Sequence, residues 1–261
     1  MDVSRYAEVM HYRNYPCCIH HYQNYPCCIH HLHLHLYSSS SFVLGFSGWS
    51  VCVAYLILGS LVTKLKMSEK EKLGIAEKRQ GQRGPENVWG SAAVAMICAI
   101  FSYLFPNNAH LFELGFVASL ATKLSDTFQS EIGKAYGKTA YLVTTLKRVE
   151  RGTEGAVSLE GTIAGVVGSL LLSIIAAFTG LGINSIQSFA ACNLAAFIAC
   201  YCESLIGATY QSDSFQWLTN ELVNLINCAI GALLSIALLV AFKSDAMGAS
   251  GILLPSFLAG T

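Results

Sequence analysis

Charged residues are scarce in this chain of 261 residues, of which they make up only 12%. A soluble domain carries about 25% charged residues, so the shortage indicates a protein whose solvent is lipid. The hydrophobic share of 53% and the mean hydropathy of +0.48 agree with this interpretation. The formal net charge is zero, which argues against an electrostatic surface for nucleic acid.

The ten cysteines lack the spacing of a structural zinc site. Six of them lie inside apolar runs, where we expect small buried hydrophobic side chains. The other four form adjacent pairs in a tandem duplication, HYRNYPCCIH at 11–20 and HYQNYPCCIH at 21–30. Cys/His-rich tracts can bind metal, but paired cysteines do not match the CxxC spacing of zinc sites. We predict a low-complexity tail over 1–41, which with only Arg5 and Arg13 is also a poor transit peptide.

Six apolar runs occupy the rest of the chain. They cover 42–62, 88–105, 111–124, 162–182, 186–209 and 222–242. Five of them reach 18 residues, and the third is shorter and contains Glu113. A helix of about 20 apolar residues crosses a hydrocarbon core of ~30 Å. We therefore predict an all-α polytopic transmembrane bundle of about six spanning helices over 42–243, followed by a C-terminal tail at 244–261.

The basic residues are sorted between the loops. Thirteen of the sixteen Lys and Arg residues lie in the segments 63–87 and 123–161, and the connections at 106–110 and 181–185 contain none. The positive-inside bias places both basic loops on the cytoplasmic side or its stromal equivalent. With six spans, the loop 210–221 lies on that same side and the C-terminus on the other.

This topology brings polar residues to one membrane face. They come from 83–87, Asp126, 151–162, Glu203 and the start of the sixth run at 220–224. A charge at membrane depth costs roughly 2.5–3.5 kcal/mol even on a lenient insertion scale. Such a gathering indicates a site at the membrane surface, with a solvated rim of helix ends as the alternative.

Asp126 and Glu131 are the carboxylates that we expect to hold a metal ion. On a straight helix they lie about 140° apart, so they reach one ion only through a bend or shared waters. Mg²⁺ is typically held by one or two carboxylates together with substrate phosphates. The alternative for Glu131 is a structural salt bridge to Lys134 or Lys138.

The stretch GKAYGKT at 133–139 approaches a P-loop without being one. The motif would require glycine at Ile132 and a preceding strand, whereas an apolar helix precedes it here. A stretch rich in Gly and Lys beside a helix still suits phosphate in a looser sense. A second such stretch follows, in which basic residues up to Arg151 precede glycines that allow close approach to a ligand.

Five stretches together resemble a known family. They are KLGIAEKRQGQRGPENVWGS (72–91), SDTFQSEIGKAYGK (125–138), RGTEGAVSLEGTIAG (151–165), ESLIGA (203–208) and LTNELVNLINCAIGA (218–232). In this order they resemble the transmembrane protein 19-like integral membrane family, and within it the plant phytyl-phosphate kinases of the vitamin E pathway. More distantly they are similar to CTP-using membrane enzymes such as dolichol kinase and phosphatidate cytidylyltransferase.

The resemblance implies that CTP gives its terminal phosphate to phytyl phosphate, with Mg²⁺ as cofactor, forming phytyl diphosphate for tocopherol and phylloquinone. The expected partners are a prenyl-phosphate lipid, CTP and membrane lipids, without nucleic acid, in a chloroplast envelope or other plastid membrane. The oligomeric state is left open.

The resemblance also assigns roles to residues. It implies metal or nucleotide ligands at Asp126 and Glu131, phosphate clamps at Lys134, Lys138 and Arg151, a close-approach loop at Gly152, Thr153, Glu154 and Gly155, loop-orienting roles for Arg83 and Asn87, and second choices at Glu160, Glu203 and Asn224. The expected catalytic residues are Asp126, Glu131, Lys134 and Arg151.

Two positions depart from the family pattern. Gln129 lies where a small residue is expected, and the duplicated tail replaces an additional hydrophobic segment before residue 42. A truncated or misassembled N-terminus would give this second departure. The alternative functions are a kinase for free isoprenoid alcohols, a cytidylyltransferase that releases diphosphate, and a non-enzymatic transporter or scaffold.

Overall fold

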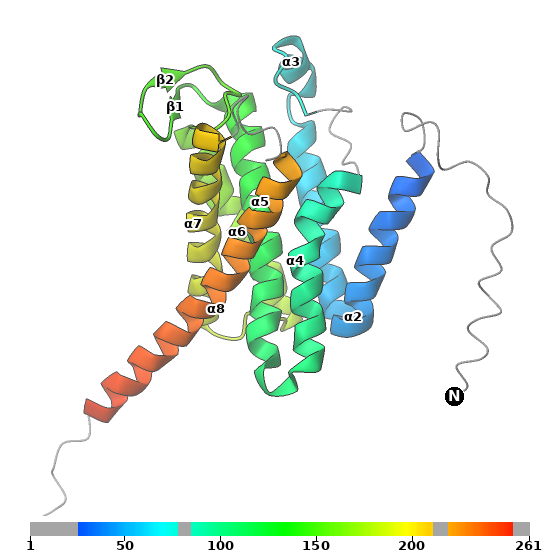
Figure 1. Ribbon diagram of the computed structural model, residues 1–261, viewed down its shortest axis with the longest axis vertical. Helices are drawn as coiled ribbons and strands as arrows, with labels where there is room; N and C mark the ends of the chain where they lie inside the picture. The colour runs from blue at the N-terminus through cyan, green and yellow to red at the C-terminus, as the bar shows by residue number, and fades with distance from the viewer. Residues whose placement is uncertain (1–25, 78–84, 211–218, 253–261) are drawn as a thin grey trace, which may run out of the picture.

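The computed structural model describes residues 26–77, 85–210 and 219–252 (Figure 1). Within these residues the long helices are α2 (Pro26–Lys64), α4 (Pro85–Leu104), α5 (Ala109–Tyr136), α6 (Leu159–Thr179), α7 (Ile186–Tyr210) and α8 (Asn220–Ile252). Each coincides with one of the six apolar runs, although α4 and α6 end one and three residues before their runs do, so the predicted all-α transmembrane bundle is confirmed. The first copy of the duplication, where metal binding was the alternative to a low-complexity tail, lies outside the described residues.

Two helices exceed their predicted bounds. Helix α2 begins at Pro26, inside the segment predicted as a tail, and it breaks at Gly45, whose φ of 63° and ψ of −153° are not helical. Helix α8 continues past the predicted end of its span to Ile252. By length and hydropathy, four of the described helices can cross a membrane alone, and a fifth span is possible if the pair α4–α5, bent by 118°, is counted as one.

Helix α5 forms the centre of the bundle and packs against α2, α4, α6, α7 and α8 (Figure 1). Every residue from Leu114 to Thr127 is buried. A helix surrounded by protein needs no continuous lipid-facing surface, which explains why its apolar run is the weakest of the six. Glycines of α6 allow a close approach to it, since a Cβ at Gly165 would lie 3.2 Å from the Ser125 carbonyl oxygen.

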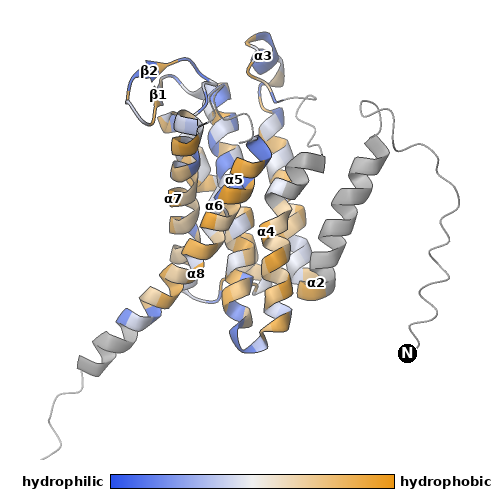
Figure 2. Cartoon of the chain, in the orientation of Figure 1, coloured by the Kyte–Doolittle hydropathy of each residue, from blue (hydrophilic) through white to orange (hydrophobic). Residues whose placement is uncertain are grey.

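The polar connections lie at one end of the bundle. Figure 1 shows there the short helix α3 (Met67–Lys72), the strands, the end of α7 and the start of α8. The opposite end carries the turn η2 (Pro106–Asn108) and the α6–α7 connection. In Figure 2 hydrophilic residues concentrate at α3 and at the strands, whereas the helices below are largely hydrophobic. The described parts of both basic loops lie at this end, together with the ends of α7 and α8 that flank the 210–221 connection, as predicted.

The second basic loop contains a small sheet that the sequence did not predict. Strands β1 (Ala140–Leu142), β2 (Arg148–Val149) and β3 (Ala156–Val157) form an antiparallel sheet in the order β2-β1-β3. Tyr141 is opposite Arg148 on one side and Val157 on the other. Strands of two or three residues leave almost no period-two pattern in the sequence, which is why they were missed.

Candidate functional site

A cavity of about 790 Å³ opens at the polar end of the bundle. Ten of the fourteen predicted site residues line it: Asp126, Glu131, Lys134, Arg151, Gly152, Thr153, Glu154, Gly155, Glu203 and Asn224. Lys138 and Glu160 are described but do not line the cavity. Arg83 lies outside the described residues, and for Asn87 only the backbone, in α4, is described. The gathering of distant polar segments at one face is therefore confirmed for most of the set.

The floor of the cavity is a charged cluster joining α5, α7 and α8. Lys123 Nζ donates to Asp126 Oδ2 at 2.5 Å and to Asn224 Oδ1 at 2.6 Å. The carboxyl of Glu203 lies in hydrogen-bonding contact with that of Asp126, which is itself only 8% exposed. Two carboxylates in such contact repel each other unless a proton or a cation lies between them. The cluster is therefore a place where positive charge is required.

Glu131 belongs to a different cluster on α5. Its buried carboxylate accepts from the ammonium of Lys70 on α3, and Lys70 also donates to the Thr63 carbonyl oxygen at 2.7 Å. The partner is thus neither Lys134 nor Lys138, the two that the sequence suggested. The wide angle expected between Asp126 and Glu131 is confirmed, since the two side chains contact different elements: Asp126 contacts Glu203 of α7, and Glu131 contacts Lys70 of α3.

The segment that follows α3 forms one wall of the cavity. Gly74, Ile75, Ala76 and Glu77 line it, and Glu77 Oε1 lies 3.6 Å from Lys134 Nζ. Together with the Lys70–Glu131 ion pair, this contact ties the α2–α4 connection to the end of α5. We call residues Met67–Glu77 the α3 strap.

Residues 152–155, which we call the glycine loop, lie between this strap and α7. Gly152 and Gly155 have φ values of 87° and 71°, a conformation that favours glycine. A Cβ at Gly152 would lie 2.7 Å from Ile75 Cγ2, and one at Gly155 would overlap Ala208 of α7. The close approach predicted for these glycines is therefore made to protein neighbours, and it fixes the loop beside the exposed Arg151.

The near-P-loop stretch is the last turn of α5 and its cap. Helix α5 ends at Tyr136, and Gly137 N donates to the Gly133 carbonyl oxygen. Both glycines pack against Ser158, the residue that caps α6 by accepting from Gly161 N at 3.1 Å. The stretch is therefore not a P-loop, as predicted, because its two glycines lie at the end of a helix and allow α5 to pack closely on α6.

Gln129, which departs from the family pattern, fills space between α5 and α7. Its side chain lines the cavity, and Nε2 donates to Ser204 Oγ at 3.4 Å. A Cβ at Gly161 would lie 2.6 Å from the Gln129 carbonyl oxygen, so α6 approaches α5 closely at the same level.

Sequence reasoning missed Lys123 and Lys70. Lys123 had a usable signal, because a lysine three residues before an aspartate on one helix is within reach of it. Lys70 had none, since its partner is sixty-one positions away and only the fold of the strap brings them together. Of the six cysteines in apolar runs, five are buried as expected and Cys202 is partly exposed.

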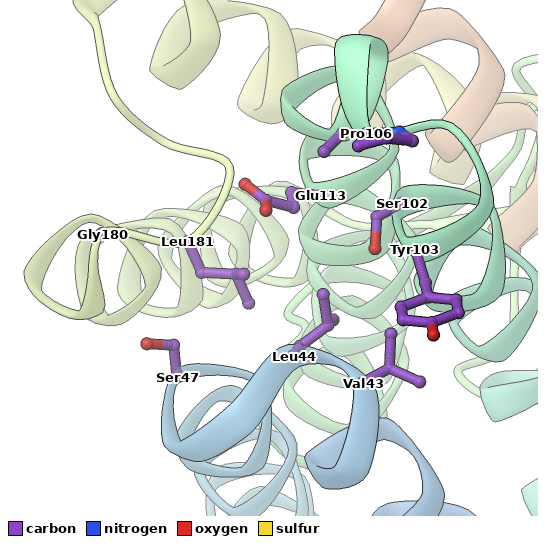
Figure 3. Close-up of a pocket in the computed structure, with 10 residues that line it drawn as sticks. Val43, Leu44, Ser47, Ser102, Tyr103, Pro106, Glu113, Gly180 and Leu181 are labelled. Atoms are coloured by element: carbon purple, nitrogen blue, oxygen red, sulfur yellow. The ribbon is translucent and has the colours of Figure 1, made fainter.

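A second hollow lies at the opposite end of the bundle (Figure 3). It measures about 510 Å³ and is lined by residues such as Val43, Leu44 and Leu181, with Glu113 as its charged member. Its lining contains no lysine or arginine among the described residues. It therefore lacks the positive charge that a phosphate site needs, and the candidate site is the cavity at the basic end.

Comparison with known families agrees with this architecture. The model of a family described as integral membrane protein DUF92 matches residues 32–232, which contain every residue of the cavity floor. The chain belongs to this family. Its fold and its family both identify it as a multi-pass integral membrane protein.

Three relatives of this DUF92 protein cover most of it. An uncharacterised membrane protein of Synechocystis is 53% identical over 196 residues, 75% of each chain. Protein VTE6, chloroplastic, of Arabidopsis thaliana is 49% identical over 196 residues, which are 74% of this chain and 58% of that protein. An uncharacterised membrane protein of Methanocaldococcus jannaschii is 31% identical over 192 residues, 74% of this chain and 76% of the relative. No solved structure matches this chain.

Proposed function

We propose that this protein is a membrane-embedded prenyl-phosphate kinase that transfers the terminal phosphate of CTP to phytyl phosphate. The product is phytyl diphosphate, a precursor of tocopherol and phylloquinone. The observation that carries the proposal is the paired carboxyls of Asp126 and Glu203, with Lys123, Lys134 and Arg151 in one cavity at the membrane surface. The likeness to the chloroplastic protein VTE6 supports it. We propose a plastid membrane as its location, with the basic end of the bundle in the stroma.

The cavity floor suits Mg²⁺. Asp126, Glu203 and the amide oxygen of Asn224 offer the oxygen ligands that this ion prefers, and two carboxylates already lie in contact there. The described residues contain no group of three or more His, Cys, Asp or Glu side chains that could hold a metal. Mg²⁺ is commonly held by one or two carboxylates plus substrate phosphates, and it would supply charge neutralisation on the transferred phosphoryl group.

The other residues position the two phosphates. Lys134 and Arg151 reach the cavity from α5 and from the glycine loop, and they would bind the nucleotide phosphates. An oxygen of phytyl phosphate attacks the γ-phosphorus of CTP, the bond from that phosphorus to its bridging oxygen breaks, and CDP leaves. The attacking phosphate is already an anion, so no general base is required. The phytyl tail can remain in the bilayer while its phosphate reaches the surface cavity.

Glu131 receives another role in this proposal. Its carboxylate is buried and paired with Lys70, so we assign it to holding the α3 strap rather than to the metal. The metal ligands that we propose are therefore Asp126 and Glu203, with Asn224 beside them.

The test uses membranes that contain the protein. They are incubated with Mg²⁺, phytyl phosphate and CTP labelled at the γ-phosphate, with γ-labelled ATP in a parallel reaction. Label in phytyl diphosphate is expected, and its absence would refute the kinase. In a separate reaction with phytol in place of phytyl phosphate, label in phytyl phosphate would identify an alcohol kinase. A CDP-linked lipid formed from CTP labelled in cytidine would identify a cytidylyltransferase. No turnover of any substrate would favour a transporter or scaffold.

A further inference from the structure

A polar stripe on α8 continues below the floor of the cavity. Asn220, Asn224, Asn227 and Gly231 follow one another at spacings of four, three and four residues, so they share one face of the helix. That face packs on α5, because Asn224 accepts from Lys123 and a Cβ at Gly231 would overlap the side chain of Thr122. Asn227 therefore faces α5, about one turn deeper in the membrane than Asn224.

Two side chains at this level are buried without hydrogen bonds. Within the described part of the chain, neither Oδ1 nor Nδ2 of Asn227 has a partner, although the residue is only 1% exposed. Thr122 Oγ1 also has none among the described residues, although Thr122 is fully buried. Other buried hydroxyls of α5 donate to their own helix, as Ser119 does to the Phe116 carbonyl oxygen. Buried polar groups are normally satisfied, so two unpaired neighbours at one level need an explanation.

The side chain of Lys123 passes this level. Its neighbour Thr122 lies against Gly231, whereas the Lys123 ammonium reaches Asn224, seven residues earlier on α8. Seven residues correspond to about two helical turns, and Asn227 lies between these two points. Rotation about the flexible lysine stem can therefore carry Nζ from Asn224 down to Asn227 without a shift of either helix.

We propose that Asn227 is a positioning residue that receives the Lys123 ammonium when a divalent cation binds at Asp126 and Glu203. The ammonium now occupies Asp126 Oδ2 at 2.5 Å, where a second positive charge would be repelled. Lys123 must then leave Asp126, and in a buried region it needs another acceptor. Asn227 Oδ1 and Thr122 Oγ1 are acceptors with free lone pairs, and Asn227 lies about one helical turn below the Asn224 oxygen that the ammonium reaches now. This inference rests on the metal-dependent function proposed above.

The experiment measures metal binding without substrate. Mn²⁺ is titrated into the purified full-length protein in nanodiscs, and free Mn²⁺ is followed by its electron paramagnetic resonance signal. Asn227→Leu should weaken binding by about fivefold, a size typical of coupling between neighbouring residues. Asn227→Ser keeps a hydrogen-bond acceptor, so it should weaken Mn²⁺ binding less than Asn227→Leu does. Asn193→Leu is the control: Asn193 Oδ1 is also buried without a partner among the described residues, but its Nδ2 donates to Ser173 Oγ and to the Phe189 carbonyl oxygen, and the residue lies on α7, away from the cavity lining.

A second variant separates this role from a general loss of packing. Lys123→Met removes the ammonium, so it should tighten Mn²⁺ binding and make the metal affinity insensitive to Asn227→Leu. An unchanged affinity in folded Asn227→Leu, or an equal loss in the Lys123→Met background, would overturn the inference. If Mn²⁺ binds neither the wild type nor Lys123→Met, the metal site fails and with it the proposed function. Thermal unfolding identifies variants that do not fold. If Asn227→Leu is one of them, the Mn²⁺ affinities of Asn227→Ser and Lys123→Met test the inference instead.

Discussion

Asp126 is the residue on which the proposed chemistry depends most directly. It contacts a cation, Lys123, and a second carboxyl, Glu203, and these come from different helices. Because Asp126 already accepts from an ammonium, a metal ion could take the place of that ammonium beside the two carboxyls. This property would be lost if either acid were made neutral.

We therefore predict that Asp126→Asn and Glu203→Gln each reduce phosphate transfer to phytyl phosphate by at least about a hundredfold, the scale expected when charge stabilisation in the transition state is lost. Both should also weaken Mn²⁺ binding. The control is Glu150→Gln, an exposed carboxylate at the same membrane face that does not line the cavity. Activity close to wild type in either cavity variant would exclude that residue as a metal ligand.

At the same scale, sequence reasoning found most of the charged residues of the site but mispaired them. Residue types and loop charges were enough to select Asp126, Glu203 and Asn224. The helical angle separated Asp126 from Glu131, but it could not identify Lys70 as the partner of Glu131. Pairing across long sequence separations depends on how segments fold over one another, which single-sequence periodicity does not contain.

At the scale of elements, the α3 strap depends on a buried ion pair. Lys70 and Glu131 are each about 1% exposed, and Lys70 also holds the end of α2 through the Thr63 carbonyl. Removing one partner of a buried pair leaves an unpaired charge, so Lys70→Met should lower the free energy of unfolding by about 3 kcal/mol. The double variant Lys70→Met/Glu131→Leu should recover much of that loss. Denaturant unfolding in detergent, with proteolysis of the strap, measures both effects.

This comparison also separates the two roles considered for Glu131. If Glu131 anchors the strap, the double variant retains binding of Mn²⁺, because Asp126 and Glu203 remain. Loss of Mn²⁺ binding in a stably folded double variant would instead restore Glu131 as a metal ligand.

The glycine loop offers a matched pair of substitutions. Gly155 and Gly180 have nearly equal φ values of 71° and 72°, but a Cβ at Gly155 would overlap Ala208, whereas one at Gly180 meets nothing within 4 Å. Gly180→Ala should cost about 1 kcal/mol through backbone strain alone. Gly155→Ala should cost roughly 1–3 kcal/mol more through overpacking. Equal losses of stability would mean that contact between the loop and α7 contributes little.

Among the elements, the six helices were predictable because apolar runs long enough to span a membrane seldom occur outside membrane-spanning helices. Their ends were less so. The break at Gly45 and the extension of α8 to Ile252 leave the number of hydrophobic residues in each run almost unchanged. The short strands depend on pairing with one another and on the contacts of β3 with α5 and α7. The central position of α5 was also hidden, because burial by protein relaxes the demand for an apolar surface.

At the scale of the whole molecule, charge and topology give the same orientation. Thirteen of the sixteen basic residues lie in the segments 63–87 and 123–161. The described parts of these segments lie at the end of the bundle where the cavity opens. The opposite end carries the turn η2 and the α6–α7 connection, which lack lysine and arginine. A cavity on the basic side would meet nucleotide from the cytoplasm or stroma, and the lipid phosphate would reach it from the adjoining leaflet.

This orientation predicts opposite labelling of two engineered cysteines. Thr145 lies in the β1–β2 turn at the basic end and Asn184 in the α6–α7 connection, and both are exposed. In sealed vesicles whose basic face points outward, a membrane-impermeant maleimide should label Thr145→Cys and reach Asn184→Cys only after the membrane is permeabilised. The native Cys202 is partly exposed on α7, so it is replaced by serine in both variants. The parent with that single replacement measures background labelling from the other cysteines. Only α6 separates the two loops, so the two positions must lie on opposite sides if α6 crosses the membrane. Labelling of both positions from the same side would refute the transmembrane placement of α6.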